Sequence, residues 1–526
     1  MAGESAQPTV PTEHARGRLT LRIAAVLFAG IVLVQLAWAP LDPMGMGYTE
    51  DEVASSFLMI AWFSGDLAGR PASELLGRHG LATAHGVVEP LVKLPFALAG
   101  RCLAPLFPAS PRFAQRFLML VPLLETAGLA TLLFLWAARL AGDLRWGVTV
   151  ALGAAFCTLL WPYAYTGLEP TQSLLLLIIG YLALSAETAG ATNGRGVGRM
   201  LGFLVLAALT VTTKRTGLLL LPAVGFLVYK YIRKRFPFTA RWKAVLALLA
   251  SVLFILAVNY GNGLLRAGYY PPWSNAALLR RFVETNPVRI ASSVLMLLFS
   301  GNKGLILFAP VAALALATLP ALWRRHRDLA TFTLLVLAAI LGGFAVVGIP
   351  ADETWGPRYL HGAIPLLLLS LAAVWGRERL ATFHKLLLVL ALLVGFAVSG
   401  LGTMFYYGRL SQAAEATRQS TLEAFWADPV WNAITMQLRL TRLWLAPQGT
   451  STVWTPQHKW WFTPPADLPP EPSVDLAFAL EPQPLLLRRT THARPRLLAV
   501  LVGSLVCGLA ALGAGVRWAW RAPRIP

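Results

Sequence analysis

Charged residues and cysteine are both scarce in this chain of 526 residues. Only 13% of the residues are charged, 56% are hydrophobic, and the mean hydropathy is +0.60. Soluble domains carry about 25% charged residues, so this composition excludes the soluble globular class. The three cysteines, Cys102, Cys157 and Cys507, are far apart in the sequence. Their spacing excludes a disulfide framework and a cysteine-based zinc site.

Sequence motifs for nucleotide and metal chemistry are also missing. The chain has no glycine-rich phosphate loop, no HExxH motif and no nucleophile elbow. The sequence therefore gives no sign of a nucleotide cofactor or of a nucleotide-activated substrate.

Long apolar runs are what the sequence has instead. Each run has roughly 18 to 22 residues, enough for a helix to cross about 30 Å of hydrocarbon. Because a lipid-exposed backbone must satisfy its own hydrogen bonds, these runs predict an all-α polytopic membrane protein with about 12 transmembrane helices. We place the spans at residues 21–40, 117–138, 147–165, 171–187, 199–213, 217–230, 244–261, 304–322, 330–349, 361–375, 386–405 and 497–516.

The basic residues indicate how the chain is oriented. The formal net charge is +20, which in a soluble protein would suggest nucleic acid as a partner. Here many of the basic residues fall in short loops on one side of the predicted spans, so they report orientation and imply no nucleic acid. We expect a multi-pass protein of the inner (plasma) membrane with both termini in the cytoplasm.

This topology predicts the organisation of the chain. A cytoplasmic tail (1–20) precedes a transmembrane core (21–405) with two long outer loops at 41–116 and 262–303. A periplasmic or extracellular loop (406–496), a last span (497–516) and a cytoplasmic tail (517–526) follow. The loop at 41–116 holds two interrupted apolar stretches, which we expect to be helices lying along the membrane interface. No internal repeat is evident, which argues against an inverted-repeat transporter.

Three consecutive acids follow the first span, at the outer surface. Within this group, Asp51 and Glu52 begin an amphipathic stretch, where carboxylates also favour the start of a helix. A carboxylate at the mouth of a membrane cavity is equally suited to act as a general base.

Cations occur at two other outer turns. Lys214 and Arg215 lie in the sequence TTKRTG between two short spans, and Arg358 precedes another span. Cations at a tight outward-facing turn between spans suit a phosphate group. Snorkelling to the interface would also explain Lys214 and Arg215, and pairing with the adjacent acids would also explain Arg358.

Further polar residues near these turns are candidates for substrate binding. They are His85, Glu89, Glu169, Asp352, Glu353 and His361. Simpler interpretations exist for two of them: Glu89 is spaced to pair with Lys93 on a helix, and Glu169 precedes a proline that can begin a helix.

Several of these motifs, in this order, resemble the GT-C superfamily of membrane glycosyltransferases. TEDEVASSFLMIAWFSGDL is similar to the first outer loop of protein O-mannosyltransferases and of the lipid A aminoarabinose transferase. HGVVEPLVKLPFALAGR, TTKRTGLLLLP and ETWGPRYL resemble later segments of such enzymes. The resemblance covers roughly residues 15 to 405.

The resemblance implies an inverting transfer from a polyprenyl-phosphate-linked sugar to a lipid, glycan or protein acceptor. It implies that Asp51 is the base, that Glu52 helps to position the substrate, and that Lys214, Arg215 and Arg358 bind the donor phosphate. No cofactor is implied. Asp51 could instead ligate a divalent ion, as in the oligosaccharyltransferase branch, but the chain has no second clear acidic motif to support a metal.

Two alternatives share this topology. A flippase or transporter of a lipid-linked sugar would also need many spans and outer cations, but the ionisable residues gather in loops and are nearly absent from the spans, Glu125 excepted. An O-antigen polymerase or ligase would depend instead on arginines of the late loop, namely Arg409, Arg418, Arg439 and Arg442.

Overall fold

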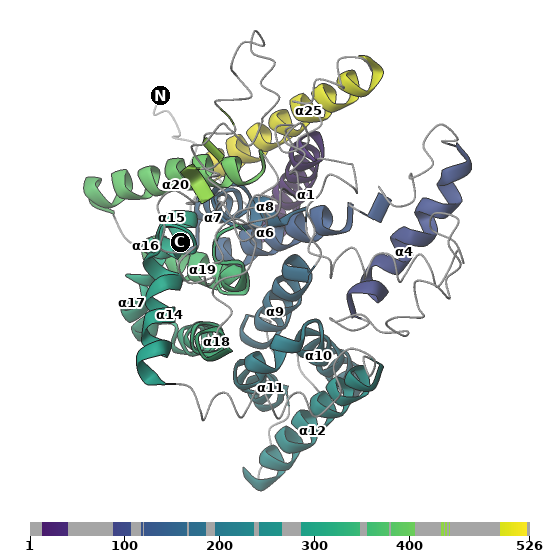
Figure 1. The fold of residues 1–526 in the computed structure, drawn as a ribbon, viewed down its shortest axis with the longest axis vertical. Coiled ribbons are helices and arrows are strands. Elements are labelled where there is room, and N and C mark those ends of the chain that lie inside the picture. Colours follow the sequence, from purple (N-terminus) through teal and green to yellow (C-terminus); the bar gives the residue numbers. More distant parts are fainter. Residues whose placement is uncertain are drawn as a thin grey trace, which may run out of the picture.

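The structure is a computed structural model, and its described part is helical throughout (Figure 1). It describes residues 13–39, 88–106, 117–118, 120–165, 168–185, 195–235, 241–265, 286–347, 355–377, 380–404, 433–435, 437–438, 441 and 495–522. The predicted all-α class is thereby confirmed for these residues.

The two ends of the described chain pack together. Helix α1 (Glu13–Trp38) lies along α25 (Pro495–Arg521), and α6 (Leu120–Ala141) and α7 (Leu144–Cys157) flank this pair. Gly30 of α1 faces Leu512, and Gly508 of α25 faces Val34, so closely that a Cβ at either glycine would clash. Small residues allow helices in a membrane to approach in this way. Both helices exceed the predicted spans, since α1 already begins at Glu13 and α25 continues to Arg521.

A second group of helices lies at the lower end of Figure 1. It comprises α9 (Leu168–Leu184), α10 (Arg195–Thr212), the 3-10 helix η2 (Arg215–Leu220), α11 (Leu221–Arg235) and α12 (Arg241–Leu265). Helix α10 packs on both α9 and α12, and η2 leads directly into α11.

The third group contains helices broken by proline. It comprises α14 (Pro287–Phe299), α15 (Leu305–Phe308), α16 (Pro310–Leu316), α17 (Leu319–Arg325), α18 (Arg327–Val347), α19 (Ile364–Trp375) and α20 (Thr382–Gly402). The prediction of one continuous span at 304–322 is wrong. Pro310 and Pro320 lack the amide proton that a continuous helix needs, and each begins a new short helix.

Seven described helices are long and apolar enough to cross a membrane. They are Gly17–Trp38, Leu120–Ala141, Thr216–Lys234, Val245–Asn262, Arg327–Val346, Thr382–Gly402 and Leu498–Arg521. Five shorter apolar helices are Leu144–Cys157, Glu169–Leu184, Gly198–Thr212, Pro287–Phe299 and Ile364–Trp375. The expected total of about 12 crossings stays a prediction. The second apolar stretch of the first outer loop forms α4 (Val88–Leu103) and η1 (Ala104–Leu106).

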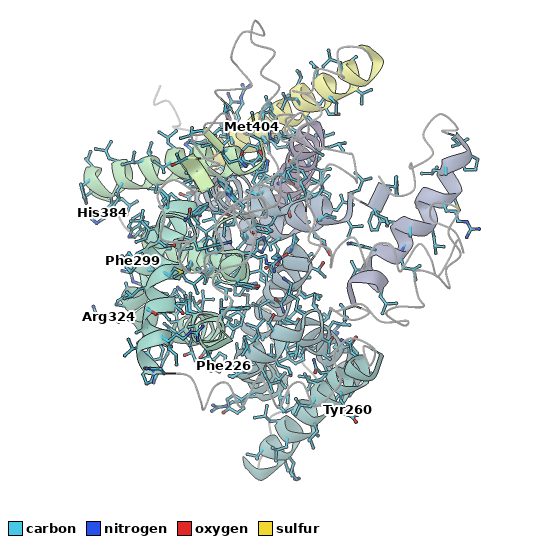
Figure 2. All side chains as sticks on the ribbon, viewed as in Figure 1. Phe226, Tyr260, Phe299, Arg324, His384 and Met404 are labelled. Carbon is cyan, nitrogen blue, oxygen red and sulfur yellow. The ribbon has the colours of Figure 1, made fainter. Side chains whose placement is uncertain are left out.

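Large apolar side chains at the periphery fit a lipid-facing surface. Tyr260 of α12 and Phe299 of α14 lie at the edge of the molecule in Figure 2, and they are 58% and 62% exposed. In water such a surface would promote aggregation, whereas in a bilayer it is the surface expected of a spanning bundle.

Helix α19 lies at the centre of the molecule. All of its residues are buried, as expected for a helix that is apolar on every side. It packs on α6, α7, α9, α16, α17 and α18. The 3-10 helix η3 (Arg358–Gly362) directly precedes it and is therefore fixed to the core.

Candidate functional site

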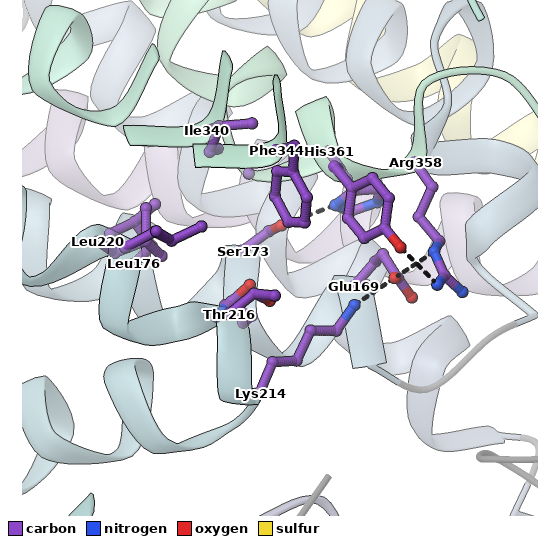
Figure 3. Close-up of a pocket in the computed structure, with 14 residues that line it drawn as sticks. Glu169, Ser173, Leu176, Lys214, Thr216, Leu220, Ile340, Phe344, Arg358 and His361 are labelled. Atoms are coloured by element: carbon purple, nitrogen blue, oxygen red, sulfur yellow. Dashed lines mark hydrogen bonds and ion pairs between the residues drawn. The ribbon is translucent and has the colours of Figure 1, made fainter. Parts of the chain in front are cut away.

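A pocket lies where α9, η2, α18 and η3 meet (Figure 3). One end is polar and the other is apolar, and Figure 3 shows Leu176 and Leu220 far from Arg358. The lining residues are Glu169, Gln172, Ser173, Leu176, Lys214, Thr216, Leu219, Leu220, Ile340, Phe344, Arg358, Tyr359, His361 and Gly362. Its cavity volume is about 20 Å³.

Two cations converge on one carboxylate at the polar end. The Lys214 ammonium group donates a hydrogen bond to Oε1 of Glu169, and Nε of Arg358 lies 3.4 Å from the same oxygen. The side chains of Glu169, Lys214 and Arg358 are 3%, 9% and 13% exposed. These three charged groups are therefore largely removed from solvent. Charge interactions are stronger in such a buried environment than at a surface.

The turn that carries Lys214 is held rigidly at the end of α10. The hydroxyl groups of Thr212 and Thr213 donate to backbone carbonyls one turn back, at 2.8 and 2.7 Å. The Gly217 amide donates to the Lys214 carbonyl at 2.9 Å, closing the first turn of η2. A Cβ at Gly217 would collide with the Val211 carbonyl oxygen, so this close approach requires glycine.

The turn that carries Arg358 has its own glycine. Gly356 has a φ of +59°, and a Cβ there would lie 2.7 Å from the Phe308 ring. Arg358 then donates from Nη2 to the Tyr359 hydroxyl at 3.2 Å, and its guanidinium lies 5.1 Å from the centre of the Tyr359 ring. Tyr359 itself stacks on Phe344, with ring centres 3.8 Å apart.

His361 lies in the same 3-10 helix and is 1% exposed. Its Nδ1 is 2.7 Å from Oγ of Ser173 on α9. Tyr163 packs edge-on against the imidazole, with ring centres 5.8 Å apart, and its hydroxyl donates to the Trp355 carbonyl at 2.8 Å. The ring is therefore held on both sides by residues that are distant in sequence.

The buried polar atoms of the pocket include two for which the described residues provide no hydrogen-bond partner. They are Oε2 of Glu169 and Nε2 of His361. Buried polar atoms in folded proteins almost always have a partner, so such atoms lining a pocket indicate a place for a polar ligand or water.

The structure thus brings together four of the residues singled out in the sequence: Glu169, Lys214, Arg358 and His361. They come from three separate turns, at the start of α9, at the end of α10 and just before α19. The expected placement of all three turns on the outer face stays a prediction.

The other predicted site residues are not placed by the structure. Asp51, Glu52, His85, Asp352 and Glu353 lie outside the described residues. Glu89 falls in α4 and Arg215 begins η2, but their side chains are not described. The expected Glu89–Lys93 pairing and the expected pairing of Arg358 with its neighbouring acids stay predictions.

The sequence reasoning missed Ser173 and Tyr359. Ser173 follows Glu169 by four residues, so helical periodicity alone puts both on one face of α9. Glu125 was noted only as an ionisable residue within a span. The structure adds that it is 8% exposed and that the Thr171 hydroxyl lies 2.8 and 2.9 Å from its two carboxylate oxygens.

The described side chains of the pocket suit an anion better than a metal ion. Within the described part of the chain, no three His, Cys, Asp or Glu residues are grouped as metal ligands. Lysine and arginine at the polar end are instead the usual partners of phosphate and carboxylate groups.

Comparison of the chain with protein-family models, with curated proteins and with solved structures finds no match. The function must therefore be inferred from the geometry of the pocket and from the sequence motifs around it.

Proposed function

We propose that this protein is an integral membrane glycosyltransferase of the GT-C type. It would transfer a sugar from a polyprenyl-phosphate-linked donor to a lipid, glycan or protein acceptor at the outer face of the cytoplasmic membrane. The observation that supports this most directly is the two-sided pocket, which places Lys214 and Arg358 beside a wall of apolar side chains.

The polar end suits the phosphate of such a donor. Lys214 and Arg358 already hold the Glu169 carboxylate, so negative charge is stabilised at this position. A phosphate oxygen approaching the same nitrogens would meet charge-assisted donors that are largely out of water. Such hydrogen bonds are about twice as strong as those between neutral groups.

The apolar end suits the lipid. Leu176, Leu220 and Ile340 line it, and burying a prenyl chain against them contributes about 0.8 kcal/mol for each buried methylene group. A free sugar phosphate would gain nothing from this wall. The combination therefore favours an amphiphilic phosphate over a soluble one.

The same cations would also assist the chemical step. When the glycosidic bond breaks, the lipid phosphate leaves with its negative charge, and desolvated cations stabilise that charge as it develops. Asp51, the proposed base, would remove the proton of the acceptor, and Glu52 would help to position the substrate. Attack from the side opposite the leaving group would invert the anomeric centre.

In vitro transfer tests this proposal. Purified protein is incubated with a panel of polyprenyl-phosphate sugars and with host membrane extract as acceptor, and release of free polyprenyl phosphate is measured. We expect release by the wild type and its loss in Lys214→Met. Lys230→Met is the matched control, because Lys230 also pairs with a carboxylate, that of Asp328 at 2.6 Å, but lies outside the pocket.

The same preparation distinguishes the alternatives. Movement of a labelled lipid-linked sugar between the leaflets of proteoliposomes, without release of lipid phosphate, would contradict the transferase and favour a flippase. Transfer that survives Lys214→Met but depends on Arg409, Arg418, Arg439 or Arg442 would favour a polymerase or ligase.

A further inference from the structure

The pocket presents one buried acceptor and one buried ring nitrogen that the described residues leave without a partner: Oε2 of Glu169 and Nε2 of His361. Glu169 and Ser173 lie one turn apart on α9, which brings side chains within about 6 Å of each other. Ser173 in turn contacts His361 at 2.7 Å. Glu169, Ser173 and His361 all line the same pocket.

The hydrogen bond to Ser173 determines which nitrogen of His361 carries the proton. Ser173 is 3% exposed, and the hydrogen bond found for its hydroxyl in the described structure goes to Nδ1 of His361. A buried hydroxyl that leaves its proton unused is unfavourable, so Ser173 donates and Nδ1 accepts. The imidazole proton is then on Nε2, which becomes a hydrogen-bond donor of a residue that lines the pocket.

A donor beside an acceptor selects the chemistry of the ligand group between them. A phosphate oxygen only accepts hydrogen bonds and would leave Oε2 of Glu169 unpaired, whereas an ammonium group only donates and would leave Nε2–H unpaired. A hydroxyl does both at once. It can accept from His361 and donate to Glu169, and the hydrogen bond to the charged carboxylate is the stronger of the two.

We propose that a hydroxyl of the donor sugar binds between His361 and Glu169, and that Ser173 is the positioning residue that orients the imidazole for this contact. The ligand is here the sugar-bearing lipid of the function proposed above, on which this inference rests. Tyr163 supports the same ring from the other side, at 5.8 Å between ring centres. Lys214 and Arg358 would then bind the phosphate, and the His361–Glu169 pair would recognise the sugar.

Binding measurements separate the two halves of this site. A short-chain polyprenyl phosphate and the same lipid phosphate carrying each of several hexoses or pentoses are titrated into the purified full-length protein in nanodiscs, using a scintillation proximity assay. The wild type should bind at least one sugar-bearing lipid about tenfold more tightly than the bare lipid phosphate. His361→Phe, which keeps a ring against Tyr163, should reduce this ratio to about one without changing the affinity for the bare lipid phosphate.

Ser173 provides the test of positioning. Ser173→Ala should lower the ratio several-fold, and Ser173→Thr, which restores a hydroxyl, should recover most of it. A sugar analogue lacking the recognised hydroxyl should bind wild type and His361→Phe equally. Each of these effects concerns the ratio of two affinities, which a general loss of stability would not change selectively.

The outcomes that contradict the inference differ from those that contradict the function. If Lys214-dependent binding of the bare lipid phosphate is observed but no sugar increases affinity, or if the ratio is the same in wild type, His361→Phe and Ser173→Ala, the sugar contact is wrong and the lipid-phosphate site stands. If the wild type binds neither kind of lipid, both proposals fail. If His361→Phe does not fold, the test of the sugar contact depends on Ser173→Ala, which removes only one oxygen atom.

Discussion

Lys214 and Glu169 form an ion pair across the junction of η2 and α9, with side chains only 9% and 3% exposed. Desolvation makes such a pair costly to assemble, but it makes breaking the pair more costly still, because one charge then remains buried without its partner. The interaction thus couples the fold to the position of the cation that we propose binds the donor phosphate.

Stability measurements should reveal the coupling of this pair. Lys214→Met should destabilise the protein by about 3 kcal/mol, because the Glu169 carboxylate then keeps Arg358 but loses its closest cation. Glu169→Gln combined with Lys214→Met should destabilise less than the sum of the single changes. Reversible unfolding of the purified protein in detergent would measure both effects.

The Lys230–Asp328 pair provides the control for this measurement. Its side chains are 22% and 49% exposed, so Lys230→Met should change stability by less than about 1 kcal/mol. Strict additivity of the Lys214 and Glu169 substitutions would show that the two residues do not interact in the folded protein.

Gly217 is predicted to be intolerant of even a small side chain. In Gly217→Ala the new Cβ would meet the Val211 carbonyl oxygen, a backbone atom that cannot move aside easily. We expect a loss of about 2 kcal/mol or more, and weaker binding of polyprenyl phosphate because the Lys214 turn is displaced.

Gly225→Ala in the neighbouring helix α11 is the matched control. A Cβ there would meet nothing within 4 Å, and alanine favours a helix over glycine by about 1 kcal/mol. Detergent unfolding should show this variant to be at least as stable as wild type. Equal stability of the two alanine variants would refute the steric argument.

The sequence predicted the helical class, because the length of the apolar runs can be read directly from it. It did not predict that the apolar run at 304–322 folds as three separate helices, α15, α16 and α17. The run is apolar throughout, and this hides the helix-breaking effect of Pro310 and Pro320. Nor did it resolve the role of Lys214, because a lysine that snorkels to the interface and a lysine in a buried ion pair can occur in the same local sequence.

The pairing partners in the site could not have been found from the sequence. For Arg358 the sequence left two interpretations open, pairing with the neighbouring Asp352 and Glu353 or binding a phosphate. The structure adds Glu169, distant in the sequence, whose Oε1 lies 3.4 Å from Nε of Arg358. Long-range packing of α9 on η3 decides this contact. Helical periodicity could have placed Ser173 on the same face as Glu169. A serine in an apolar helix has no distinctive sequence signal, however, until its partner His361 is known.

Asp51 is predicted to be the catalytic base. Asp51→Asn should reduce sugar transfer by about 100-fold or more, because the amide cannot accept the acceptor's proton. Thermal stability in detergent and binding of polyprenyl phosphate should stay close to wild type. Glu169→Gln, compared in the same assay, should reduce transfer less. An Asp51→Asn protein with full activity would remove this residue from the mechanism.

The last prediction concerns which side of the membrane the pocket faces. Helix η2 follows Lys214 and leads into α11, which ends at Arg235, so we expect residues 236–240 on the other side of the membrane from the pocket. If the pocket opens to the outside, Phe238→Cys should resist a membrane-impermeant thiol reagent in intact cells, and Thr455→Cys should react, each in a background without Cys102, Cys157 and Cys507. Permeabilised cells, in which both positions should react, control for accessibility. The reverse pattern in intact cells would place the pocket on the cytoplasmic side and contradict a donor that is used at the outer face.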